Sequence, residues 1–169
     1  EQKKQCFATK SGWVLENGAL TGNDNPNADP EILVAIGELA TSIGAADITE
    51  IEFITTAFDV SDGGTLQVRV RFNEAVDVTG TPQLTVVNDS RANHTLSYAS
   101  GTGSNELVFS LTIAAGGGGV IADGDELSIG ANATALNGGT IKDAGTNTAS
   151  TITNAAGVGT AAGTITAVA

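Results

Sequence analysis

The sequence predicts an all-β protein, in which an antiparallel β-sandwich of about seven strands follows an extended N-terminal arm. One observation is that apolar residues recur at every second position between Thr65 and Ile113, the period of a strand with one buried face. The other is that each apolar run stops at a glycine-rich or Asx-rich turn, as in a series of short paired strands. The alternating positions are Leu66, Val68, Val70 and Phe72, then Leu107, Phe109, Leu111 and Ile113.

Residues 1–46 are predicted to form the arm, and residues 47–169 the sandwich domain. The Asx, Gly and Pro density of residues 22–30 excludes regular structure there, whereas the apolar run 32–36 predicts a short strand and residues 38–43 one helical turn. An apolar strand beyond a flexible loop has to be buried on its own sandwich or on a neighbouring subunit, and we expect the neighbour. The residues of the arm predicted to bind this partner are Trp13, Ile32, Leu33, Val34 and Ile36.

From residue 47 onward the strand signals recur at the spacing of a sandwich. Strands are predicted near residues 48–58, 65–73, 83–88, 94–99, 106–114, 126–130 and 160–168, with weaker pairing around 135–141 and 150–153. The low-complexity segment 114–119 predicts a flexible loop. Because only 4% of the residues are aromatic, the core is expected to be mainly aliphatic, with the few large rings anchoring its layers.

Charge narrows the range of partners. The chain has 19 acidic and 7 basic residues, which give a formal net charge of −12. Such a surface repels nucleic-acid phosphates and anionic lipid headgroups, so we expect no direct nucleic-acid binding and no membrane binding. No apolar run reaches the length of a membrane span.

Arg69 and Arg71 lie on the polar face of the predicted strand 65–73, because they alternate with its apolar residues. One interpretation is an ordinary solvated face. The other is a docking patch for an acidic partner surface, which makes these two arginines further candidates for partner binding.

No constellation of residues predicts catalysis, so we expect a protein that is not an enzyme. His94 is the only histidine, it shares a strand face with Leu96, and no nucleophile in a recognisable setting accompanies it. With one histidine and one cysteine, zinc lacks soft ligands. The turn Asp123-Gly124-Asp125-Glu126 offers oxygen ligands for calcium, but Asx-turn chemistry is the interpretation we favour, and we expect no cofactor.

Three segments carry a family resemblance that covers roughly residues 48–150. Residues 72–82 read FNEAVDVTGTP after the alternating apolar run, residues 98–104 read YASGTGS, and residues 136–143 read LNGGTIKD. In order and spacing these segments resemble the immunoglobulin-like repeats of large bacterial surface proteins. Similar domains occur as single copies in virion structural proteins of tailed bacteriophages, after a short segment that resembles GWV at 12–14 and EILVAI at 31–36.

The resemblance implies an immunoglobulin-like fold and a virion structural role. One module after one arm cannot build an extended stalk and suits a particle-bound subunit, so the resemblance favours a head decoration or cement protein that stabilises the capsid from its surface. The implied partners are the major capsid protein or other virion subunits, with homo-oligomers on the particle. The alternative is an adhesion or carbohydrate-binding module of a phage tail or a bacterial surface.

Overall fold

The computed structural model describes residues 6–9, 12–15, 31–35 and 45–169. The chain divides into two compact units, Glu1–Ile43 and Gly44–Ala169, and each is described by itself. The unit boundary falls three residues before the end of the arm predicted from the sequence.

The described segments of the first unit form a three-stranded antiparallel sheet. Its strands are β1 (Cys6–Thr9), β2 (Gly12–Leu15) and β3 (Glu31–Ala35), with β2 in the centre. The strand predicted in the apolar run is confirmed as β3, whereas the strand that holds Trp13 was not predicted, because four residues are too few to show an alternating pattern. These segments are therefore paired strands, and the extended arm expected from the sequence is not confirmed. Ile36, the predicted loop 22–30 and the helical turn 38–43 lie outside the described residues.

The second unit is almost entirely β-structure, and the all-β prediction is confirmed. Two short helical elements accompany its strands, the 3-10 turn Ala115–Gly119 and the helix α1 (Ala156–Thr160). The strands are β4 (Ile48–Phe53), β5 (Phe58–Asp59), β6 (Gly64–Thr79), β7 (Gln83–Asn88), β8 (His94–Ser100), β9 (Ser104–Ile113), β10 (Glu126–Ser128), β11 (Thr134–Ala135), β12 (Thr140–Asp143) and β13 (Ile165–Val168).

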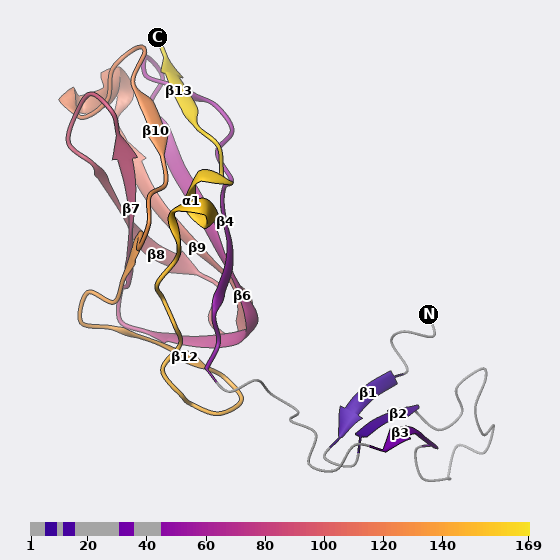
Figure 1. Ribbon diagram of the computed structural model, residues 1–169. Coiled ribbons are helices and arrows are strands. Elements are labelled where there is room, and N and C mark those ends of the chain that lie inside the picture. The colour runs from indigo at the N-terminus through magenta and orange to yellow at the C-terminus, as the bar shows by residue number, and fades with distance from the viewer. Residues whose placement is uncertain (1–5, 10–11, 16–30, 36–44) are drawn as a thin grey trace. The chain divides into compact units, whose positions relative to one another are not determined.

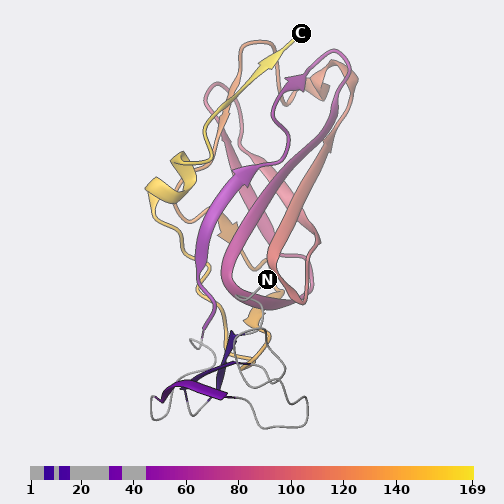
Figure 2. The same ribbon diagram turned by 90° about the vertical axis from the view of Figure 1, so that its right-hand side faces the viewer.

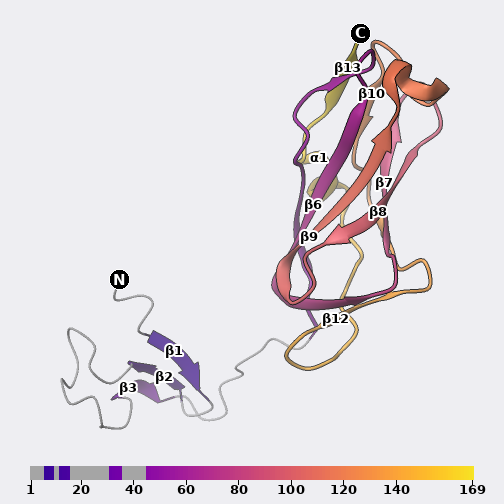
Figure 3. The same cartoon turned by 180° about the vertical axis from the view of Figure 1, so that it is seen from behind.

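These strands form one mixed, curled sheet. Its order is β12-β6-β9-β8-β7-β10-β13-β5, with β4 paired to β6 and β11 paired to β7. In Figure 1, strands β7, β10 and β13 lie on the side nearer the viewer. Figure 3 shows the molecule from behind, with β6, β9 and β8 on the nearer side. All pairs are antiparallel except β13 with β5, which is parallel, so the prediction of a purely antiparallel sheet is wrong at this pair.

The core fills the inside of the curl. On β6 the four predicted apolar positions are buried while the three polar residues between them are half-buried, which confirms the predicted register. On β9, Leu107 and Phe109 are fully buried and Val108 between them is only half-buried. The largest fully buried side chains are Phe72, Phe109, Ile51, Leu66, Leu84, Leu96, Leu107, Leu127, Ile129 and Ile141.

Three predicted strands differ in extent. The strand expected at 48–58 breaks after Phe53, because the amides of Ile54 and Thr55 both donate to Gln67 O and the chain then crosses to pair with β13 as β5. The strand expected to end at residue 73 runs to Thr79, since its second half finds another neighbour, β12. The strand expected at 160–168 begins only at Ile165, and helix α1 before it packs beside β4 (Figure 2).

The glycine-rich segment expected as a flexible loop contains the 3-10 turn Ala115–Gly119. Gly116, Gly117 and Gly118 all have positive φ, between 55° and 75°, a backbone that side chains other than glycine rarely adopt. At Gly63, on the neighbouring turn, φ is +67° and an added Cβ would lie 2.6 Å from the backbone of Ala114. Glycine is therefore needed for the two turns to approach each other.

Candidate functional site

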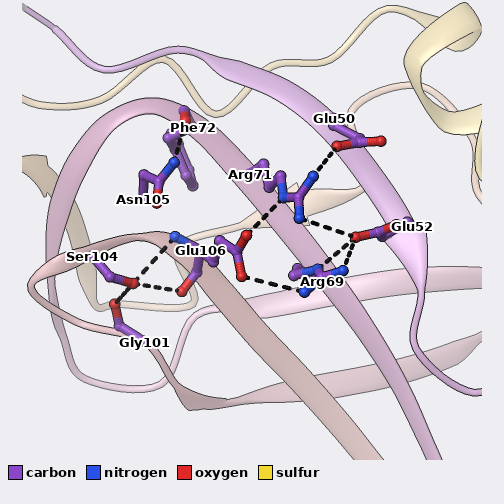
Figure 4. Close-up of polar contacts among 9 residues, drawn as sticks. All are labelled: Glu50, Glu52, Arg69, Arg71, Phe72, Gly101, Ser104, Asn105 and Glu106. Carbon is purple, nitrogen blue, oxygen red and sulfur yellow. Dashed lines mark hydrogen bonds and ion pairs between the residues drawn. The ribbon is translucent and has the colours of Figure 1, made fainter. Parts of the chain in front are cut away.

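Arg69 and Arg71 belong to a ladder of five charged side chains on the outer face of the sheet (Figure 4). The register places Glu50 opposite Arg71 and Glu52 opposite Arg69 on β4, and Glu106 opposite Arg71 on β9. Because side chains on one face of paired strands meet their cross-strand neighbours, the two arginines lie between glutamates on both sides. We call these five residues the charge ladder.

Each arginine of the charge ladder binds glutamates on two strands. Arg71 Nε donates to Glu106 Oε1 at 2.8 Å, and Arg71 Nη1 donates to Glu50 Oε2 at 2.9 Å. Arg69 donates through two nitrogens to Glu52 Oε1 and through Nη1 to Glu106 Oε2 at 3.3 Å. Glu106 thus bridges both guanidinium groups, one with each oxygen.

The hairpin between β8 and β9 positions Glu106. Ser104 Oγ accepts the Glu106 amide at 3.2 Å and lies 2.8 Å from Gly101 O, so the start of β9 is tied to the turn before it. Nearby, Asn105 Nδ2 donates to Phe72 O on β6 (Figure 4). These contacts bring Glu106 over the arginines of the neighbouring strand.

The pairing within the charge ladder also changes its acid–base behaviour. The hydrogen bond from Arg71 lowers the pKa of Glu106 below its ordinary 4.5, and the bond to Glu106 raises the pKa of Arg71. With three carboxylates for two guanidinium groups, the ladder carries one net negative charge. An acidic partner would therefore have to displace glutamates before it could reach either arginine.

Two of the predicted partner-binding residues of the first unit, Trp13 and Leu33, have side chains that the structure describes. Trp13 is 47% exposed and Leu33 50% exposed, whereas Val14 and Leu15, next to Trp13 on β2, are buried. Trp13 pairs with Val34 across β2 and β3, and a bulge follows on the β3 side, where Ile32 pairs with Val14. The small sheet therefore buries apolar side chains and leaves a tryptophan and a leucine open to solvent.

His94 is buried and belongs to a polar cluster at one end of the sheet. Asn88 Nδ2 donates to Asp125 Oδ2 at 3.0 Å and lies 3.4 Å from His94 Nε2, while Arg91 Nε pairs with the same Asp125 oxygen at 3.0 Å. Asn88, His94 and Asp125 are each 4% exposed. We call Asn88, Arg91, His94 and Asp125 the His94 cluster.

The carboxylates considered for calcium serve as acceptors within turns. Asp125 Oδ2 also accepts the Ala122 amide, so three donors converge on it, and the bond from Asn88 is the main cause that lowers the pKa of Asp125. Asp123 Oδ1 accepts the Ala169 amide. Among the described residues, no group of three or more His, Cys, Asp or Glu side chains is placed to hold a metal ion.

Sequence reasoning found the arginines of the charge ladder but missed their partners. The signal was present, because Glu50 and Glu52 alternate on one strand with the same spacing as Arg69 and Arg71 on another. For the His94 cluster no such signal exists, since Asp125 is 37 residues from Asn88 and only the fold brings them together.

In comparisons with known proteins, no protein-family model matches the chain, and no match was found among the curated proteins or the solved structures. In the part of the chain that the structure describes, no helix is long and apolar enough to cross a membrane.

Proposed function

We propose that this chain is a non-enzymatic structural protein of a tailed-bacteriophage virion, a decoration or cement protein that binds the outside of the capsid shell and stabilises it. The observation that carries the proposal is the small sheet of the first unit, which leaves Trp13 and Leu33 exposed. A tryptophan and a leucine on a compact unit separate from the main domain are suited to bury themselves on another subunit.

The strand order supports an immunoglobulin-like fold for the second unit. The run β4-β6-β9-β8 corresponds to strands A-B-E-D of that fold, and the run β7-β10-β13 corresponds to C-F-G. The pairing of β7 with β8 joins the two runs into a continuous curled sheet, which departs from two separate sheets. Immunoglobulin-like domains serve as recognition and structural modules in many proteins, so this fold fits the proposal.

The charges are also compatible with a particle surface. A net charge of −12 keeps the protein soluble and away from packaged nucleic acid. The charge ladder satisfies both of its arginines internally, so we assign attachment to the exposed apolar residues and not to Arg69 and Arg71.

Co-sedimentation tests the proposal. The probe is expanded capsid shells assembled from the major capsid protein encoded in the same genome, mixed with the full chain or with the double variant Trp13→Ala, Leu33→Ser. We expect the unaltered chain to sediment with the shells and the double variant to remain in solution. The matched control is Ile54→Ser, which removes an exposed apolar side chain of the second unit and should leave attachment unchanged.

Two results would overturn the proposal: an unaltered chain that stays in solution with these shells, or a double variant that binds them as well as the unaltered chain. Deletion of the first unit, residues 1–43, gives a second test, since we expect the remaining domain to stay folded and monomeric and to lose attachment.

The second candidate function is carbohydrate binding. It is favoured by one observation: of the aromatic side chains that the structure describes, only Trp13 is exposed, and a sugar ring packs well on an indole face. Saturable binding on a glycan array, lost in Trp13→Ala, would place this function above attachment to the capsid.

A further inference from the structure

The His94 cluster contains a buried titratable ring whose protonation state the structure defines. His94 is the first residue of β8, opposite Val86 of β7, and the loop that connects these two strands contributes Arg91 to the cluster. The other side of His94 lines a surface hollow of about 340 Å³, which is formed with Leu111 and Ile113 of β9 and with the glycine-rich turn. Water therefore reaches the neighbourhood of the ring although the residue is 4% exposed.

Asn88 has only one orientation compatible with its neighbours. Its Oδ1 accepts the amides of Ser90 and Arg91 at 3.0 and 2.9 Å, both of which can only donate. Its Nδ2 faces the Asp125 carboxylate, which can only accept while it is ionised. A flipped amide would place donors against donors and oxygen against oxygen, so the nitrogen of Asn88 must point to Asp125 and His94.

This orientation determines the state of His94. The Asn88 amide presents N–H groups to His94 Nε2, at a long hydrogen-bond distance of 3.4 Å, so that Nε2 has to carry a lone pair and the ring proton belongs on Nδ1. Protonation of Nε2 would direct one N–H group at another. Burial lowers the pKa of His94 below 6.5, and it outweighs the opposing attraction of Asp125.

The charged groups around the ring come from two elements. Asp125 lies in the turn before β10, and Arg91 in the β7–β8 loop pairs with it. Asp89 of the same loop accepts the Glu126 amide through Oδ1, which ties that loop to the start of β10. From β9 and the glycine-rich turn, the residues that line the hollow are uncharged. Protonated His94 would therefore meet the Asn88 amide and, beyond it, an Asp125 oxygen already bonded by three donors.

We propose that protonation of His94 releases the β7–β8 loop. The neutral ring accepts a hydrogen bond from Asn88 and completes the cluster that holds residues 89–93. A proton on Nε2 breaks that contact and loosens the loop. The released amides would be those of Ser90 and Arg91, because both depend on Asn88 staying in place. Such a release changes the conformation of one end of the sheet between neutral and mildly acidic pH. Glu106, Asp125 and Asp143 take no part in this range, because each of them has a lowered pKa and titrates below it.

Nuclear magnetic resonance of the full chain tests the proposal directly, since a single histidine gives a single set of ring signals. The ¹⁵N shifts at pH 7.5 should show a protonated Nδ1 and an unprotonated Nε2, and the ring should titrate with a pKa below 6.5. An Nε2-protonated neutral ring, or a pKa at 6.5 or above, would overturn the proposal without any variant.

Hydrogen exchange measures the release itself. Protection factors of the Ser90 and Arg91 amides, corrected for intrinsic exchange, should fall by up to about tenfold for each pH unit below 6.5 until the native ring titrates. In His94→Gln, whose side-chain oxygen accepts from Asn88 at every pH, both amides should keep the same protection from pH 7 to pH 5. Equal pH dependence in this variant and the unaltered chain would contradict the proposal, as would constant protection in the unaltered chain.

The substitution Asp125→Asn tests how the charge of Asp125 affects the pKa of His94. Because the Asp125 charge raises the pKa of His94, its removal should shift the His94 titration to lower pH. A shift to higher pH would show that another group controls the ring.

Discussion

The charge ladder and the His94 cluster are both networks of polar side chains that connect strands distant in sequence, yet they lie in opposite environments. The side chains of the ladder are between 31% and 47% exposed, whereas three of the four residues in the His94 cluster are 4% exposed. Water can replace any partner that the ladder loses, but Asn88 and Asp125 are buried away from the hollow beside His94, so a lost partner there is not replaced easily. The His94 cluster should therefore contribute more to the stability of the protein than the charge ladder.

The largest loss in the free energy of unfolding is expected from a substitution in the apolar layer beneath the charge ladder. Phe109→Ala removes a fully buried ring on β9 and should lower the free energy of unfolding by about 3 to 5 kcal/mol. Its matched control is Val108→Ala on the adjacent, half-buried position of the same strand, which should cost clearly less. Chemical denaturation of both variants checks the ranking, and the reverse order would mean that the strand register is wrong by one residue.

Within the comparison itself, Asn88→Ala should have the larger effect. The substitution leaves the Asp125 carboxylate without one donor and the Ser90 and Arg91 amides without their acceptor, so we expect a loss of about 1 to 3 kcal/mol in unfolding free energy. Asn105→Ala is a suitable control, since Asn105 is exposed, lies on the extended strand β9 beside the charge ladder, and donates through Nδ2 to Phe72 O. Similar losses in the two variants would remove the distinction between buried and exposed networks.

Acid should weaken the two regions in separate pH ranges. The folded-state pKa of His94 is lowered, so the unfolded chain binds the proton more readily and stability falls as the pH drops below 6.5. The folded-state pKa of Glu106 is also lowered, so its contribution is present above pH 4.5 and is lost only as the pH falls below that value. Unfolding midpoints between pH 3 and pH 8 should therefore decline in two steps, and His94→Gln should remove only the first.

The smallest effect is expected from the charge ladder. A double-mutant cycle of Arg69→Gln and Glu52→Gln should give a coupling free energy below about 1 kcal/mol, because both side chains are about one-third exposed. The coupling should fall further when the ionic strength is raised from 0.05 to 1 M, by roughly the screening expected for exposed charges. A coupling free energy larger than the loss in unfolding free energy measured for Asn88→Ala would show that the five-residue network acts cooperatively.

The core-facing residues of the main strands can be assigned from the sequence alone. Alternation is a local property, so Leu66, Val68 and Val70 identify the inner face without any knowledge of their neighbours. The same pattern placed Arg69 and Arg71 on the outer face. In the first unit, the apolar run was enough to predict a strand at β3.

Strand pairing and the partners of buried polar residues depend on which segments meet, and only the folded structure shows this. Alternation does not say that β6 continues past Asn73 to pair with β12, or that β5 lies parallel to β13, because strand pairing is a contact between segments far apart in the chain. For the same reason His94 looked like an ordinary strand residue until the fold placed Asn88 and Asp125 beside it. Residue types and their period are written locally, whereas burial and partnership arise only when the sheet curls around its core.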